Sequence, residues 1–169
     1  MRYLLSLLLI TMMIHASAQS EFSNPTIQVG VVTQDLEKSK QFYTDVIGMT
    51  QTGGFEVTSD IAKSTGLTAG ETLSVAVMKL EDSPSANEWK LMSFGKSGEN
   101  AGHNYITEDV GMRYITIFYN SLNTVHERVK SNDIPMLGET PVKLPDGRHF
   151  ILVQDPDGTF IELIGPMDE

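Results

Sequence analysis

Residues 26–49 read TIQVGVVTQDLEKSKQFYTDVIGM, and the hydrophobic pattern changes its period once within this stretch. Residues 26–33 are rich in β-branched side chains, which predicts a strand. Asp35 then has the position and the side chain of a helix N-cap, and apolar residues recur at helical spacing beyond it. Gly48 follows where the left-handed residue after a helix belongs. The stretch therefore predicts a strand and then a helix of about thirteen residues.

Three more strands and a short helical turn are expected in the first half of the chain. The turn is SDIAKSTGL (59–67), and the strands are MTQTGGFEV (49–57), ETLSVAVMKL (71–80) and EWKLMSF (88–94). A loop rich in Gly, Asn and Ser runs from Gly95 to about Glu108. The order of elements before this loop is βαβββ.

The second half repeats this order. A strand is expected at 111–119 (GMRYITIFY), an amphipathic helix at 121–133 (SLNTVHERVKSND) with Ser121 as its cap, and three strands at IPMLGETPVKL (134–144), RHFILVQ (148–154) and TFIELIG (159–165). The last two strands are joined by Asp-Pro-Asp-Gly at 155–158, which favours a hairpin turn.

The two halves also enter their helices in matching register. Gln28 lies seven residues before Asp35, and Tyr114 lies seven residues before Ser121. The amino-acid sequences of the two halves differ, so the repeat lies in the order of the elements and not in the residues. We expect an α+β fold made of two βαβββ modules.

Residues 1–18 are set apart from this repeat. They combine a basic start at Arg2, an apolar stretch, and Ala16-Ser17-Ala18, which together predict a secretory signal peptide cleaved after Ala18. An uncleaved membrane anchor would need about 20 apolar residues. We expect an exported protein, periplasmic or secreted, with no membrane contact after cleavage.

Composition excludes several classes of function. The chain has no cysteine, so disulfides, thiolate metal sites and cysteine nucleophiles are absent. Its formal net charge is −10, and removal of Arg2 would make it one unit more negative, which argues against nucleic acid as a partner. Neither a phosphate loop nor a dinucleotide fingerprint, nucleophile elbow or His-Glu-x-x-His helix occurs.

Two segments resemble the opening and closing signatures of the vicinal oxygen chelate superfamily. These are VVTQDLEKSKQFYTDVIGM (31–49) and ILVQDPDGTFIELIGP (151–166). The superfamily includes glyoxalase I, extradiol dioxygenases, and the fosfomycin and bleomycin resistance proteins. The resemblance implies a half-open β-barrel with a central cleft, in one domain over 19–169: module one at about 26–94, a loop at about 95–110, and module two at about 111–166.

The resemblance also implies where a divalent metal would be held, on the first and fourth strands of each module. Gln28 and Glu162 match two of the four ligand positions. Lys90 stands where a carboxylate is expected, and Tyr114 where His or Glu is expected. A protonated amine cannot coordinate a metal, and two protein ligands are fewer than such ions prefer. We therefore expect no cofactor, with a divalent metal as the alternative.

Strand alternation allows the same residues to be interpreted without a metal. If Glu162 faces the cleft, then Gln28, Lys90 and Tyr114 face it too, with Met92 and Phe118 among its walls. Such a pocket suits a small polar or aromatic molecule. We expect Lys90 to pair with Glu162, since a buried charge needs a partner.

Three histidines follow the signal peptide, at 103, 126 and 149, and all are expected at the surface. His149 begins a strand that borders the cleft. None stands at a ligand position.

Three functions remain open from the sequence. The first is an exported, metal-independent protein that binds a small molecule. The second is a metal-dependent lyase, isomerase or dioxygenase, in which Glu162 is a ligand. The third is metal-free proton transfer of the epimerase type, with Glu162, Lys90 and Tyr114 as catalytic candidates. A homodimer is compatible with the resemblance.

Overall fold

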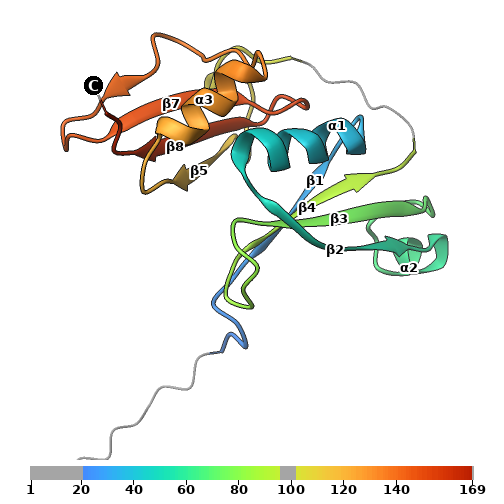
Figure 1. The fold of residues 1–169 in the computed structure, drawn as a ribbon. Coiled ribbons are helices and arrows are strands. Elements are labelled where there is room, and N and C mark those ends of the chain that lie inside the picture. The colour runs from blue at the N-terminus through green and yellow to red at the C-terminus, as the bar shows by residue number, and fades with distance from the viewer. Residues whose placement is uncertain (1–20, 96–101, 169) are drawn as a thin grey trace, which may run out of the picture.

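Two four-stranded sheets form the protein, one from each half of the chain (Figure 1). The computed structural model describes residues 21–95 and 102–168, so the predicted signal peptide lies outside the described residues. The strand orders are β1-β4-β3-β2 and β5-β8-β7-β6. The predicted α+β fold of two βαβββ modules is confirmed, although the two sheets are not closed into a barrel.

The elements follow the predicted order with one short helix added before the second module. Module one contains β1 (Gln28–Val32), α1 (Leu36–Gln41), η1 (Phe42–Ile47), β2 (Thr50–Val57), α2 (Ser59–Ser64), β3 (Leu73–Lys79) and β4 (Glu88–Ser93). After η2 (Ile106–Glu108), module two contains β5 (Tyr114–Phe118), α3 (Asn123–Ser131), β6 (Val142–Lys143), β7 (His149–Gln154) and β8 (Phe160–Gly165). None of the helices in these described segments is long and apolar enough to cross a membrane.

The first helix begins and ends where the sequence predicts. The side chain of Asp35 accepts a hydrogen bond from the Lys38 backbone N at 3.1 Å, which satisfies one free N–H of the first turn. Gly48 has a φ of 91°, the left-handed conformation that glycine adopts without strain. The second half of this helix, η1, is a π-helix, which is an unusual geometry that the sequence pattern does not show.

Two predictions for module two are wrong in detail. The helix α3 begins at Asn123 and not at Ser121, although the Ser121 hydroxyl accepts a hydrogen bond from the Asn123 backbone N at 3.3 Å. The strand expected over residues 134–144 is reduced to Val142–Lys143. Pro135 and Pro141 lack the N–H that a ladder requires, so this segment cannot pair along its length.

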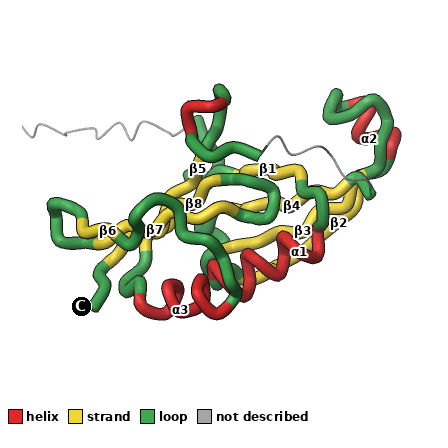
Figure 2. Tube along the Cα trace, turned by 90° about the horizontal axis from the view of Figure 1, so that it is seen from above, coloured by secondary structure: helices red, strands yellow, loops and turns green. Residues whose placement is uncertain are grey.

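The helices α1 and α3 lie on the same side of the strands (Figure 2). A single core lies between them and both sheets, and it includes Tyr43 and Leu91 of module one with Leu122, Ile151 and Leu163 of module two, all fully buried. On the other side of the strands, Ala62 of α2 packs on Leu73, Val75 and Val77 of β3. We call this second side the open face.

Module two bonds to the helix of module one along its length and at its end. The Ser39 hydroxyl in α1 donates to Asp157 Oδ2 at 2.7 Å, and the Tyr43 hydroxyl in η1 donates to Asp155 Oδ2 at 2.7 Å. At its end, Arg128 of α3 donates to the Val46 carbonyl at 2.7 Å and to the Ile47 carbonyl at 2.9 Å. These carbonyls are acceptors that a helix leaves unsatisfied at its C-terminus. The Asp-Pro-Asp-Gly turn is thus a joint between the modules as well as a hairpin turn.

Candidate functional site

The predicted site residues share the open face, and strand pairing shows why. In module one Gly30 pairs with Lys90 and Val32 pairs with Met92, in parallel register. In module two Thr116 pairs with Glu162. Paired residues point to the same side of a sheet, and the alternate residues of β4 and β8 are in the buried core. Lys90 and Glu162 therefore occupy equivalent positions in the two modules.

Lys90 is held by its own sheet. Its Nζ donates to Gln28 Oε1 at 2.6 Å and lies 3.5 Å from Glu88 Oε2. Glu88 also approaches Lys79 Nζ, at 3.6 Å. The Lys90 ammonium lies 5.6 Å from the centroid of the Phe55 ring, which adds a cation–π contact. These contacts form a connected polar network across the open face of module one.

Glu162 is held by the other sheet. Its Oε2 accepts a hydrogen bond from the Thr116 hydroxyl at 2.5 Å, and no hydrogen bond or ion pair of the described residues joins it to Lys90. The predicted pairing of Lys90 with Glu162 is therefore wrong. Each residue has a nearer partner on the neighbouring strand of its own sheet, and for Glu162 this is a short charge-assisted hydrogen bond to one carboxylate oxygen.

Glu88 is a site residue that the sequence interpretation did not single out. It pairs with Gln28 in the ladder and lies two residues before Lys90, so it faces the same side. The alternation of polar and apolar residues in EWKLMSF (88–94) already places Glu88 and Lys90 on one face of the strand. Glu88 is not at one of the family ligand positions, so the family resemblance does not point to it.

The remaining predicted residues are more loosely placed. Tyr114 is 46% exposed and Phe118 is 67% exposed, and the Arg148 guanidinium lies 5.6 Å from the centroid of the Phe118 ring. Met92 is half-buried and lies over Gly30, where an added Cβ would come within 2.9 Å of its methyl group. Gly30 thus leaves room for the Met92 side chain on the open face.

A cavity of about 340 Å³ lies at the seam between the two sheets. We call it the seam cavity. It is bordered by β1 and β5, which are edge strands of their sheets, and by residues near them: Ile27, Val29, Met49, Leu80, Asn87, Glu88, Trp89, Met112, Tyr114, Ile115, Thr116 and Ile117. Glu88 connects it to the Lys90 network, and Thr116 connects it to Glu162. Of the residues predicted to bind a ligand, Tyr114 lines the cavity itself, and Lys90 and Glu162 adjoin it through these neighbours.

The donor set does not fit a divalent metal of the kind that the resemblance implies. Gln28 offers the amide oxygen that matches a ligand position, and that oxygen is already bound by the Lys90 ammonium at 2.6 Å. A cation placed there would meet a fixed positive charge. Glu162, the other matching residue, is in the second sheet and is bonded to Thr116.

The histidines take no part in this network. His126 is only 8% exposed, so its predicted surface position is wrong; it lies on the inner face of α3, between Val125 and Val129 in sequence. Burial is the largest cause that lowers the pKa of His126, and Lys130 adds to it. His149 is half-buried and shares the core side of β7 with Ile151, away from the open face.

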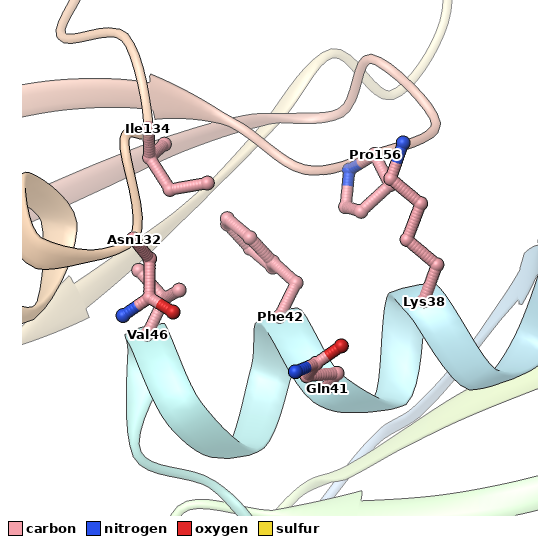
Figure 3. A pocket seen from close by; sticks show the side chains of 7 residues that line it. All are labelled: Lys38, Gln41, Phe42, Val46, Asn132, Ile134 and Pro156. Carbon is pink, nitrogen blue, oxygen red and sulfur yellow. The ribbon is translucent and has the colours of Figure 1, made fainter.

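A second, smaller cavity of about 210 Å³ lies on the helix side, at the joint between the modules. Figure 3 shows Phe42 pointing from the helix toward Ile134, and Lys38 extending toward Pro156. Its walls come from α1, η1, the segment after α3 and the turn at Pro156. None of the predicted site residues contributes to it.

Comparison with known proteins defines the family. The sequence model of the Glyoxalase/Bleomycin resistance protein/Dioxygenase superfamily matches residues 27–163, so the chain belongs to this superfamily. No curated protein matches the sequence.

Solved structures share the fold of this chain. A glyoxalase family protein from Bacillus cereus is 18% identical, with a TM-score of 0.70, and the match covers 90% of this chain and all of the other. Glyoxalase I from Zea mays is 20% identical with a TM-score of 0.64 over 85% of this chain, and glyoxalase I from Leishmania major is 19% identical with a TM-score of 0.59 over 85% of this chain and 87% of the other. The chain spans only 45% of the maize enzyme, and identities this low show the fold alone.

Proposed function

We propose that this chain is an exported binding protein of the glyoxalase superfamily, which holds a small polar or aromatic molecule between its two sheets without the usual metal. The observation that carries this proposal is the contact of 2.6 Å between Lys90 Nζ and Gln28 Oε1. Lys90 supplies a covalently attached positive charge at a position where the family resemblance implies a metal ligand.

The surroundings of Lys90 support a role in binding. Its Nζ lies 3.5 Å from a carboxylate oxygen and 2.6 Å from an amide oxygen, and these contacts hold the side chain in one position on the open face.

The small-molecule role rests on what the two sheets present together. One sheet offers the Lys90 network and the other offers Glu162 and the Tyr114 ring, and the seam cavity of about 340 Å³ adjoins both. Cavities of this size, mostly apolar and with a few placed polar groups, are typical of small-molecule sites.

The test is the metal content of the purified mature protein, followed by titration with zinc, nickel, manganese and iron(II). We expect wild-type protein to hold less than one equivalent and to bind none of these ions tightly at neutral pH. Lys90→Glu restores a carboxylate beside Gln28 and Glu88, and we expect it to gain divalent-metal binding. Lys79→Glu is the matched control, because it makes the same charge change beside the same Glu88 at a position where no ligand is expected.

Two results would overturn the proposal. Stoichiometric metal bound tightly by the wild-type protein would favour a metal-dependent lyase, isomerase or dioxygenase instead. Equal metal binding by Lys90→Glu and Lys79→Glu would show that general acidity, and not the position of Lys90, controls metal affinity. Export is tested separately, by N-terminal sequencing of protein recovered from outside the cytoplasm, with residue 19 expected first.

A further inference from the structure

We propose that the seam cavity takes the apolar part of the ligand, and that this ligand is an uncharged molecule with an aromatic or branched apolar group bearing a carbonyl or hydroxyl oxygen. This inference rests on the proposed binding function and names the class of ligand. It follows from the floor, the mouth and the polar groups of the cavity.

The floor of the cavity is formed by apolar side chains that are packed in the core. Met49, Trp89 and Ile117 are each less than 9% exposed and belong to the main core, and they line the cavity with their outer surfaces. Because core side chains are packed in fixed positions, the cavity keeps its shape without a ligand. An apolar group that enters it would displace water from these surfaces, which is favourable.

The mouth of the cavity gathers large apolar side chains that are exposed. Ile27 is 66% exposed, Leu80 54% and Met112 63%. Single exposed apolar residues are ordinary, but several around one cavity form a patch of the kind that marks a binding site. They extend the apolar surface that a ligand would contact beyond the floor.

The polar groups at the cavity offer donors rather than a free charge. Asn87 Oδ1 already accepts the Ile27 backbone N–H at 2.9 Å, which leaves the Asn87 amide hydrogens free to donate. The Tyr114 hydroxyl makes no hydrogen bond to the described part of the chain. Both groups suit an oxygen acceptor on the ligand.

The charged groups near the cavity already have partners within the protein. Glu88 is shared by Lys79 and Lys90, and the Glu162 carboxylate on the far side accepts the Thr116 hydroxyl. Glu88 is the one charged residue among the described residues that line the cavity, so the lining offers no cation to an anionic ligand, and the carboxylate that it would offer to a cationic ligand already has two ammonium partners. Desolvation would then oppose the binding of an ionised ligand without compensation.

Trp89 provides a direct readout, because it is the only tryptophan in the chain and it lines the cavity. The experiment titrates the mature protein with acetophenone, which has an aromatic ring and a carbonyl, and follows Trp89 fluorescence. Benzoate has the same ring with a charge, and toluene has the ring without oxygen. We expect a saturable change with acetophenone, and binding weaker by about tenfold or more with benzoate and with toluene.

Leu80→Glu and Leu67→Glu form a matched pair of variants. Leu80 is 54% exposed at the mouth, and Leu67 is 65% exposed in the loop after α2, away from the cavity. Both should fold, which thermal unfolding followed by circular dichroism would verify. We expect Leu80→Glu to weaken acetophenone binding by about tenfold or more and Leu67→Glu to leave it unchanged.

Each alternative outcome is decisive. No saturable change, or equal binding by the two variants, would overturn the inference, and so would tighter binding of benzoate than of acetophenone. Gel filtration that shows a wild-type dimer dissociated by Leu80→Glu would assign the apolar mouth to a second copy of the chain and overturn it also. If Lys90→Glu gains metal as expected while acetophenone fails to bind, the proposed function stands and only the ligand class is wrong.

Discussion

The Tyr43 hydroxyl donates a hydrogen bond of 2.7 Å to Asp155 Oδ2, which joins residues 112 positions apart in the sequence. Tyr43 is fully buried and Asp155 is 5% exposed. Asp155 also accepts the backbone N–H groups of Asp157, at 3.0 Å, and Thr159, at 2.7 Å. One buried carboxylate therefore orders the β7–β8 turn and fastens it to the helix of module one.

Replacement of Tyr43 by Phe should destabilise the protein by about 1–3 kcal/mol, because Asp155 would keep its burial and lose its one side-chain donor. The ring would remain, so packing is preserved. Urea denaturation followed by circular dichroism measures the change. Tyr105→Phe is the control, since Tyr105 is 68% exposed; an equal, near-zero effect of both variants would contradict the assigned role of the bond.

Alkaline pH should also weaken the fold. Burial first, and then the Asp155 carboxylate, raise the pKa of Tyr43 well above 10, and burial raises the pKa of Tyr119 to about 12. Above pH 10 the unfolded chain loses these protons while the folded chain keeps them. The free energy of unfolding therefore falls as pH rises, by up to about 1.4 kcal/mol per pH unit for each tyrosine.

Urea denaturation at a series of pH values from 8 to 11 tests this dependence. Tyr43→Phe should show a shallower decline than the wild type above pH 10, because one of the two groups is gone. A decline of the same slope in both proteins would show that Tyr43 does not titrate in this way.

Arg128 should stabilise the protein through the end of the first helix. Its guanidinium donates to the Val46 and Ile47 carbonyls, and Arg128→Met would leave both without this donor. We expect a loss of about 1.5–3 kcal/mol, the usual range for hydrogen bonds to a charged group. Arg148→Met removes an exposed ion pair with Asp146 and should cost about 0–1 kcal/mol. Similar losses in the two variants would contradict the capping role of Arg128.

The sequence predicts the fold well because its local signals agree with one another. Asp35 caps the first helix and Gly48 ends it, as predicted, and both depend on chemistry within a few residues. The strand expected over residues 134–144 is wrong for most of its length, because Pro135 and Pro141 lack the N–H groups that a ladder requires. The register of Gln28, Lys90 and Glu162 on one face was also predictable, since a period of two needs no knowledge of tertiary structure.

The partners of the site residues were less predictable. Whether Lys90 meets Glu162 or Glu88 depends on how far apart the two sheets lie, which no local pattern contains. The same is true of Asp155 and Asp157, which read as turn residues and also bind the first helix. When a side chain makes both local and long-range interactions, the sequence pattern around it indicates only the local one.

The helix of module one is completed by residues that are synthesised long after it. Ser39 in its first half bonds Asp157, Tyr43 in its second half bonds Asp155, and its last carbonyls accept hydrogen bonds from Arg128. A ribosome that has released only the first sheet has therefore made a helix that is capped by Asp35 but lacks its bonds to module two, and an apolar face with half of its core still missing. The two halves look like duplicates, but the first depends on the second, so the shared core is complete only after β8 has been synthesised.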